Sequence, residues 1–369
     1  MSAPKPTRYV VRPPRGCRKV AEPHFLESAH VFARLDALPR ERLGLLPTPL
    51  VAAPQLARAI GLPDLWIKHD ELIGFGFGGN KVRGLELLIA DARARGADVV
   101  VTGAGAQSNH VRATAAAAAQ AGMEAVAAYW GHEPATVQGN LRLTRLLGAQ
   151  TRFTNNGDRA QVDAAIAAIA EELRRAGRRP YAIPRGGACA LGVLGHVLAA
   201  RELQRQCALI GLQPGTVFLA VGSGATLAGW LLGSALLGAT WRVEGVTVSR
   251  PASEVRTRVV ALAAEAAALL DVPSSVNEAV TGAVTEADVV VHDGFIGEGY
   301  GVPTAAGNAA IVLAARAQGL FFDPTYTGKA FAGLTALAAA GRFAERGPLV
   351  FLHTGGEPAL FADSSKGPI

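Results

Sequence analysis

The residues best suited to chemistry lie in a glycine-rich segment, Phe75–Glu86, which reads FGFGGNKVRGLE. Its glycines precede Asn80 and Lys81, and a helical pattern begins directly after the lysine. Glycines let the backbone approach a ligand closely, and a helix N-terminus offers free N–H groups to it. The helix dipole also favours the neutral form of the Lys81 amine, which is the form that attacks an aldehyde. The segment predicts a Schiff-base lysine, with a glycine-rich turn and a surface lysine as the alternative.

Lysine is rare in this chain, which has 6 lysines among 36 basic residues. A lysine that has not been replaced by arginine indicates amine chemistry, because a guanidinium group does not deprotonate in proteins. Three lysines lie near the chain ends, and three lie inside it: Lys68, Lys81 and Lys329.

A second segment, TGAGAQSNHVR at 102–112, has four hydrogen-bonding side chains in a row at the start of a predicted helix: Gln107, Ser108, Asn109 and His110. Ser108 fits the helix N-cap by propensity. A cap needs only one such side chain, so we expect the group, with the free N–H groups of the helix, to bind a substrate carboxylate. A dinucleotide loop is disfavoured, because Ser108 replaces the third glycine of the G-x-G-x-x-G pattern.

A third segment, FLAVGSGATLAG at 218–229, reads as a strand, a turn and a helix, with the turn formed by Gly222, Ser223, Gly224, Ala225 and Thr226. Backbone N–H groups and hydroxyls make this turn suitable for a phosphate. No G-K-[ST] follows, so it is not a nucleoside-triphosphate loop. A dinucleotide site stays open from this segment alone, although Leu227 and the lack of an acidic ribose partner disfavour it.

Two of the five tyrosines lie in glycine-flanked loops before predicted helices. Tyr300 is part of GEGYGVP, and Tyr326 is part of DPTYTGK, where Thr327 follows it. The segment HTGG at 353–356 similarly places Thr354 beside two glycines after the last apolar run. Such turns favour close approach of a ligand. Packing in the core or at an interface is the alternative for the tyrosines.

Several classes of function are disfavoured. The net charge of +6 comes from scattered basic residues without interleaved aromatic residues, so we expect no nucleic acid. His69, Asp70 and Glu71 alternate between the faces of a predicted strand, so we expect no metal. Ser108 lies in no G-x-S-x-G elbow, which disfavours a serine hydrolase. We expect no membrane segment and no secretory leader, and the three sparse cysteines are typical of the cytoplasm.

Short apolar runs alternate with longer helical patterns, which is typical of an α/β fold with a mostly parallel sheet covered on both faces. The predicted strands are Leu65–Lys68, Val99–Thr102, Ala125–Tyr129, Val217–Val221, Val243–Val248, Val289–Val291 and Leu349–Leu352. The predicted helices are Val82–Arg95, His110–Ala121, Thr136–Leu147, Arg159–Ala176, Leu191–Gln206, Thr226–Leu237, Ser253–Leu270, Pro303–Ala317 and Lys329–Ala340. The first forty residues read as an irregular Pro/Arg-rich arm. Sites in such folds form where strands end and helices begin, and the segments above lie at those junctions.

In order, the motifs GGNKVR, QSNHVR, GSGATLAG, YGVP, DPTYTGKA and HTGG resemble the D-cysteine desulfhydrase / 1-aminocyclopropane-1-carboxylate deaminase family, from about Pro47 to Phe361. These pyridoxal-phosphate enzymes have the tryptophan-synthase-β fold (fold type II). The resemblance implies two open, twisted, mostly parallel sheets flanked by helices. It implies a large cofactor-binding domain of residues 1–84 and 191–369, with an N-terminal arm at 1–44, and a small domain of residues 85–190. It also implies pyridoxal 5'-phosphate, a small amino-acid substrate and a cytoplasmic homodimer.

The resemblance also implies roles for individual residues. Lys81, preceded by Asn80, corresponds to the lysine that forms the Schiff base with the cofactor. Ser108 lies near the substrate carboxylate and Asn109 near the phenolic oxygen of the cofactor. Residues 222–226 form the phosphate loop, Thr327 lies beside the cofactor ring, and the active-site tyrosines are Tyr300 and Tyr326. We expect the substrate site to be completed by Gln107, His110 and Thr354.

Two threonines favour the desulfhydrase branch, because the deaminase branch usually has Glu at position 327 and Leu at position 354. A carboxylate beside the pyridine nitrogen keeps it protonated and strengthens the electron sink, whereas the Thr327 hydroxyl does not. Elimination of a good leaving group needs this sink less than opening of a cyclopropane does. Gly84 replaces a lysine that often contacts phosphate in the family, so we expect the loop, or an arginine such as Arg83, to bind the phosphate.

The sequence therefore predicts a pyridoxal-phosphate-dependent lyase that removes the β-substituent of a small amino acid and releases a 2-oxo acid and ammonia. Lys81 is the predicted base at Cα, Ser108 binds the carboxylate, and Tyr300 and Tyr326 orient the substrate or assist the leaving group. D-Cysteine is the first substrate to test, followed by cysteate-type sulfonates and β-chloroalanine. Ring opening of 1-aminocyclopropane-1-carboxylate, β-replacement and an inactive relative that binds amino acids remain as alternatives.

Overall fold

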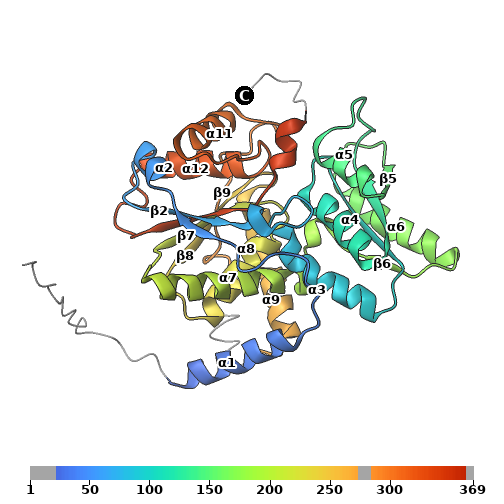
Figure 1. The fold of residues 1–369 in the computed structure, drawn as a ribbon, viewed down its shortest axis with the longest axis horizontal. Coiled ribbons are helices and arrows are strands. Elements are labelled where there is room, and N and C mark those ends of the chain that lie inside the picture. The colour runs from blue at the N-terminus through green and yellow to red at the C-terminus, as the bar shows by residue number, and fades with distance from the viewer. Residues whose placement is uncertain (1–21, 273–283, 363–369) are drawn as a thin grey trace, which may run out of the picture.

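The structure, a computed structural model, describes residues 22–272 and 284–362 and contains two separate β-sheets (Figure 1). The larger sheet has the strand order β1-β2-β10-β7-β8-β9, and the smaller sheet has the order β5-β4-β3-β6. Within the described residues, β1 and β2 are antiparallel and every other strand pair is parallel. The strands are β1 (Leu50–Ala52), β2 (Leu65–His69), β3 (Val99–Ala104), β4 (Glu124–Tyr129), β5 (Gln150–Phe153), β6 (Pro180–Ala182), β7 (Thr216–Val221), β8 (Arg242–Thr247), β9 (Val290–His292) and β10 (Leu349–His353).

Helices cover both faces of the larger sheet, as β7 illustrates. Its alternate residues Val217 and Leu219 pack into one core cluster with α7, α8 and α9, whereas Phe218 and Ala220 pack into another with α11 and α12. The helices are α1 (Glu22–Ala37), α2 (Pro54–Ala59), α3 (Lys81–Ala94), α4 (Asn109–Ala121), α5 (Gly139–Leu146), α6 (Gln161–Arg175), α7 (Ala190–Ile210), α8 (Ala225–Leu236), α9 (Ala252–Leu269), α11 (Ala305–Gln318) and α12 (Thr327–Ala339). The predicted fold class, with two mostly parallel sheets flanked by helices, is confirmed.

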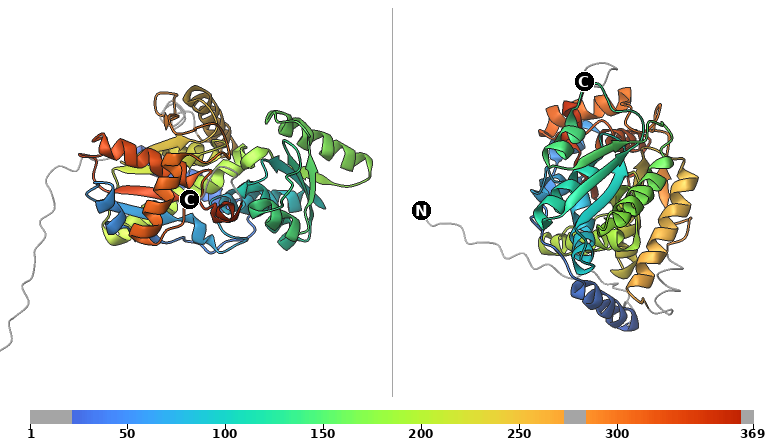
Figure 2. Two further views of the ribbon diagram at one scale, coloured as in Figure 1. Left: turned by 90° about the horizontal axis from the view of Figure 1, so that it is seen from above. Right: turned by 90° about the vertical axis from the view of Figure 1, so that its right-hand side faces the viewer.

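The prediction of an irregular N-terminal arm was wrong for residues 22–37, which form α1. Val31 and Leu35 are spaced one helical turn apart and are buried against the core cluster that contains α7. Arg34 also forms an ion pair with Asp271, with an Nη2–Oδ2 distance of 2.7 Å. Figure 2 shows α1 running along the outside of the body. Residues 1–21 of the predicted arm lie outside the described residues.

Close packing of α3 on α7 explains one unusual position in the sequence. A Cβ atom at Gly84 of α3 would lie 2.7 Å from the carbonyl oxygen of Gly192 in α7. A lysine therefore does not fit at position 84 without separating the two helices. The predicted domain boundaries after residues 84 and 190 remain a prediction. Within the described residues, no helix is both long enough and apolar enough to cross a membrane.

Candidate active site

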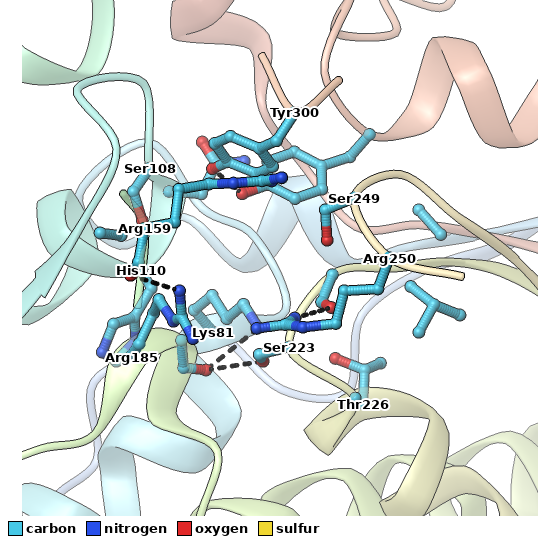
Figure 3. A pocket seen from close by; sticks show the side chains of 18 of the residues that line it. Lys81, Ser108, His110, Arg159, Arg185, Ser223, Thr226, Ser249, Arg250 and Tyr300 are labelled. Atoms are coloured by element: carbon cyan, nitrogen blue, oxygen red, sulfur yellow. Dashed lines mark hydrogen bonds between the residues drawn. The ribbon is translucent and has the colours of Figure 1, made fainter. Parts of the chain in front are cut away.

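A cavity of about 410 Å³ lies at the carboxyl ends of strands from both sheets (Figure 3). Residues that follow β3 and β4 line it on one side, and residues that follow β7 and β8 line it on the other. This is the position at which parallel sheets bind ligands. The predicted residues that line this cavity are Asn80, Lys81, Ser108, Asn109, His110, Gly222, Ser223, Gly224, Thr226, Tyr300, Tyr326 and Thr354.

Lys81 is the first residue of α3, and its side chain lies in the cavity. A turn in which Gly79 has φ 98° leads into the helix, and the Asn80 N–H donates to the Thr354 carbonyl at 3.1 Å. The Lys81 Nζ atom donates to the Gly186 carbonyl at 3.2 Å. Burial lowers the pKa of Lys81 to about 8. About a tenth of this amine is therefore neutral at pH 7, far more than for a lysine with the usual pKa.

The other two internal lysines have structural partners instead. The Lys68 Nζ atom donates to the Thr48 carbonyl at 2.6 Å, within a buried ion network that includes Glu202. The Lys329 Nζ atom donates to the carbonyls of Ile296 and Gly299. Of the three internal lysines, Lys81 is the one whose amine lines the cavity.

The turn between β7 and α8 can hold an anion. Gly224 precedes α8 with φ 97°, and none of the side chains that the structure describes caps this helix, so the first N–H groups of α8 remain available to a ligand. The Asn80 Nδ2 atom donates to Thr226 Oγ1 at 2.9 Å and ties the turn to the segment that carries Lys81. A Cβ atom at Gly186 would lie 2.6 Å from Ser223 Oγ, so a side chain there would fill the space beside the turn.

Three arginines that the sequence reasoning missed line the cavity: Arg159, Arg185 and Arg250. Arg250 lies closest to the anion-binding turn, because its Nη1 atom donates to the Gly222 carbonyl at 3.2 Å. The expectation that Arg83 binds phosphate was wrong. The guanidinium group of Arg83 is bound to Asp70 at 2.7 Å and to Glu202 at 2.9 Å, and Arg83 does not line the cavity.

The start of α4 forms another part of the wall. Ser108 is the N-cap as predicted, with its Oγ atom accepting from the Val111 N–H at 3.3 Å. Asn109 lies beside it, and its Oδ1 atom accepts from Asn140 Nδ2 at 2.9 Å. Gln107 does not line the cavity, because its amide is bound to the start of α5, where Oε1 accepts from the Asn140 N–H at 2.9 Å.

His110 lies near Lys81 but remains neutral. Burial is the main cause that lowers the pKa of His110 to about 3, and the positive charge of Lys81 lowers it further. The His110 Nε2 atom is 3.0 Å from Thr102 Oγ1. The ring therefore contributes hydrogen bonding and no charge, which leaves Lys81 as the better candidate for a base.

Tyr300 and Tyr326 meet at the cavity wall, and their hydroxyl groups are hydrogen-bonded to each other. Burial raises the pKa of Tyr300 to about 12 and the pKa of Tyr326 well above its usual value, so both hydroxyls are protonated at neutral pH. Trp130 packs edge-on against Tyr300, with ring centroids 5.3 Å apart. The pair can therefore donate a proton or a hydrogen bond to a group in the cavity.

Asp323 sets the position of Tyr326 at the start of α12. One Asp323 carboxylate oxygen, Oδ2, accepts from the N–H groups of Thr325 and Tyr326, both at 2.9 Å. The other, Oδ1, accepts from the N–H and Oγ1 of Thr327, both at 2.8 Å. These four bonds use the acceptor sites of the carboxylate. Thr327 is therefore buried beneath the cavity wall and does not line it, and neither does Ala225.

Lys329 holds the loop that carries Tyr300. Its side chain is fully buried, and Nζ donates to the Ile296 carbonyl at 2.7 Å and to the Gly299 carbonyl at 2.9 Å. Burial lowers the pKa of Lys329 to about 8, against the opposing effect of the Asp323 charge. We infer that this lysine positions the tyrosine without touching a ligand.

Replacing Lys329 by methionine should therefore lower kcat/KM by about tenfold while leaving the cofactor bound, because the loop loses two charge-assisted hydrogen bonds. The matched control is Thr335→Val, which removes one hydrogen bond from the same helix, far along it from Tyr300. Steady-state kinetics and thermal melting of both variants separate the effects. A kcat/KM unchanged in Lys329→Met, or lowered equally in both variants, would contradict the positioning role.

Comparison with known proteins supports a common origin. A model of the family described as "Pyridoxal-phosphate dependent enzyme" matches residues 41–355. The D-cysteine desulfhydrase of Salmonella paratyphi C is 39% identical over 334 residues, which is 89% of this chain and 97% of that protein.

Solved structures agree with this finding. A structure described as an "ACC deaminase homologue" superimposes with a TM-score of 0.81 at 37% identity, covering 90% of this chain and 96% of the other. A fungal L-serine ammonia-lyase from Rhizomucor miehei has a TM-score of 0.62 at 20% identity, with 87% of this chain and 96% of the other covered. The second likeness shows the fold alone.

Proposed function

The chain belongs to the family of pyridoxal-phosphate-dependent enzymes, and we propose that it is a lyase that eliminates the β-substituent of a small amino acid. The observation that carries this proposal is one cavity with two features. Lys81 brings an amine of lowered pKa, and the uncapped start of α8 provides an anion site beside it. Relatives named D-cysteine desulfhydrase make D-cysteine the first substrate to test.

The residues of the cavity fit pyridoxal 5'-phosphate. The phosphate would bind to the turn at 222–226 and to Arg250, and Lys81 Nζ would hold the aldehyde carbon. Asn109 lines the same cavity and can donate to the phenolic oxygen of the ring. When bound, the cofactor supplies the electron sink that stabilises negative charge at the substrate Cα.

The residues of this chain bind the substrate, accept its Cα proton and assist its leaving group. Ser108 and the first N–H groups of α4 bind the substrate carboxylate. Lys81 Nζ accepts the Cα proton, for which its lowered pKa makes it a suitable base. The Cβ–X bond breaks with its electron pair leaving on X, and the Tyr300–Tyr326 pair protonates or orients X. The unsaturated product hydrolyses to a 2-oxo acid and ammonia.

Elimination is favoured over ring opening of 1-aminocyclopropane-1-carboxylate by the residues near Tyr326. Thr327 is neutral, and the four hydrogen bonds to Asp323 leave that carboxylate no acceptor site for a ring nitrogen. A weaker electron sink suffices when a good leaving group departs from Cβ. β-Replacement and an inactive relative that binds amino acids are the other outcomes to test.

A panel of D- and L-amino acids tests the proposal, with 2-oxo acid, ammonia and released sulfide measured separately. We expect sulfide, pyruvate and ammonia in equal amounts from one enantiomer of cysteine. Formation of 2-oxobutyrate from 1-aminocyclopropane-1-carboxylate at a higher kcat/KM would favour ring opening instead. A protein that stays colourless with added pyridoxal phosphate would refute both enzymatic functions.

The pH dependence of cofactor attachment follows from the lowered pKa of Lys81. Its usual value is 10.5, and burial lowers it to about 8, so half of the amine is in the reactive neutral form at pH 8 and not only at pH 10.5. The rate at which cofactor-free protein gains visible absorption should rise about tenfold per pH unit below pH 8 and level off above it. Stopped-flow absorbance measures this rate. A rate that keeps rising to pH 10 would contradict the lowered pKa.

We further propose that the protein is a cytoplasmic homodimer. Each subunit would have a large domain, formed by residues 1–84 and 191–369, and a small domain, formed by residues 85–190. Exposed apolar side chains at Leu45, Leu72 and Phe77 support a contact between copies. Light scattering of the purified protein tests the dimer, and a monomer at micromolar concentration would refute it.

A further inference from the structure

His196 on α7 is a buried histidine for which the proposed reaction has no role. Its pKa lies well below its usual value, mainly because of burial and further because of the positive charges of Lys81 and Arg83. The ring is therefore neutral, so one ring nitrogen carries a proton and the other does not. Its Nε2 atom is 3.4 Å from Thr226 Oγ1, whereas Nδ1 is buried and has no hydrogen-bond partner in the part of the chain that the structure describes. The residue that it contacts, Thr226, lines the cavity.

Glycines bring the three helices around His196 into close contact. A Cβ atom at Gly195 of α7 would collide with the carbonyl group of Arg83 in α3. A Cβ atom at Gly229 of α8 would collide with the Cβ atom of His196 itself. Gly229 is three residues after Thr226, about one helical turn along α8. This packing therefore holds the imidazole of His196 beside the Thr226 hydroxyl group.

The hydrogen bonds of Thr226 indicate which ring nitrogen carries the proton. Thr226 Oγ1 accepts from Asn80 Nδ2 at 2.9 Å, and a hydroxyl oxygen can accept a second hydrogen bond. Without a proton, His196 Nε2 would accept the only Thr226 hydroxyl proton, and an Nδ1–H group would be buried without an acceptor. With its proton on Nε2, His196 donates to Thr226 Oγ1 and leaves only an unpaired acceptor at Nδ1. Among backbone groups, a buried N–H without a partner is rarer than a buried acceptor without one, which favours the second arrangement.

We propose that His196 is a positioning residue for the cofactor phosphate, because its Nε2–H donates to Thr226 Oγ1 and leaves the Thr226 hydroxyl proton free to bind a phosphate oxygen. Figure 3 shows Thr226 at the end of the cavity where Ser223 lies. Position 84 is glycine and supplies no lysine to the phosphate, so a hydroxyl group oriented by a neutral ring contributes there. This inference rests on the proposed cofactor site, and it holds for any amino-acid substrate.

Nitrogen-15 NMR of the histidine rings in the cofactor-free protein measures the protonated nitrogen directly. We expect His196 to be neutral with its proton on Nε2 at neutral pH, and we expect its Nε2 signal to shift when inorganic phosphate is added. The signal that is lost in His196→Gln identifies this residue. A proton on Nδ1, or a signal that does not respond to phosphate, would overturn the proposal in the unaltered protein.

Titrations of the cofactor-free protein with pyridoxal and with pyridoxal 5'-phosphate separate the phosphate from the rest of the cofactor. The ratio of the Kd for pyridoxal to the Kd for pyridoxal 5'-phosphate should fall about tenfold in His196→Phe. His196→Gln should keep most of the ratio, because its amide nitrogen can take the place of Nε2. The matched control is His196→Asn, which has the same amide group on a shorter side chain and should lose the ratio.

A double variant tests whether His196 acts through Thr226. In His196→Phe combined with Thr226→Val, the ratio should fall no further than in Thr226→Val alone. Losses that add in the double variant, or an unchanged ratio in His196→Phe, would overturn the role of His196. Thermal melting checks the fold of each variant, and if His196→Phe does not fold, equal ratios in His196→Gln and His196→Asn would overturn the role instead. A wild-type protein that does not bind pyridoxal 5'-phosphate would refute the proposed function.

Discussion

Replacing Lys81 by alanine should abolish turnover, with a fall in kcat of about 10³-fold or more, and should remove the visible absorption of the bound cofactor. The reason is that Lys81 Nζ has two tasks, which are to hold the cofactor and to accept the Cα proton. The uncapped start of α8 and Arg250 remain in the variant, so the phosphate still has a site. Absorption spectra and steady-state kinetics measure the two effects separately.

The matched variant is Lys81→Arg, which keeps the length and charge of the side chain but cannot supply a neutral amine. We expect it to be as inactive as Lys81→Ala. Added methylamine should restore a part of the activity of the alanine variant, because the substituted site leaves room for a small free base. Retention of the visible band in either variant would contradict the assignment of Lys81.

Replacing Tyr326 by phenylalanine should lower kcat/KM by about 10²-fold for a substrate whose leaving group needs a proton, and should change it little for β-chloroalanine. The two hydroxyls at positions 300 and 326 share one hydrogen bond, which leaves one O–H free to donate. Both pKa values are raised, so this proton is present at neutral pH. Steady-state kinetics with cysteine and β-chloroalanine measure the difference.

Tyr300→Phe is the natural counterpart, because it removes the other hydroxyl of the same pair. If the pair acts as a relay, both variants should show the same dependence on the leaving group. An equal loss with both substrates in Tyr326→Phe would show that the tyrosine orients the substrate and does not protonate the leaving group.

The central elements of the fold could be predicted from sequence because each has a strong local pattern. The strand β7 is an apolar run that ends at a glycine turn, and the observed helix α8 begins within one residue of the predicted start. The strands β5, with the sequence QTRF, and β6, with PYA, were missed because they are short and only partly buried. The helix α1 was missed because its packing against α7 depends on contacts distant in the sequence.

Residues of the site could be predicted where a side chain or turn suited to ligand binding lies at the start of a predicted helix. Lys81, Ser108 and the turn at 222–226 each stand at a helix start, where sequence patterns are informative. The arginines could not be found this way, because Arg159 and Arg185 come from separate loops that only the fold brings together. Arg250 follows β8 closely at the carboxyl edge of the sheet, and that position was the one signal in the sequence.

Arg83 shows the opposite error. It lies two residues after Lys81, but the two side chains leave α3 in different directions, and Asp70 and Glu202 bind the guanidinium group in the interior. Proximity in the sequence was therefore a poor guide to which arginine faces the anion site.

The most direct test of the account is to reduce the holoenzyme with borohydride, digest it and locate the modified peptide by mass spectrometry. We expect a single phosphopyridoxyl group, attached to Lys81 Nζ. A modified lysine at any other position, or a reduced protein without the label, would contradict it.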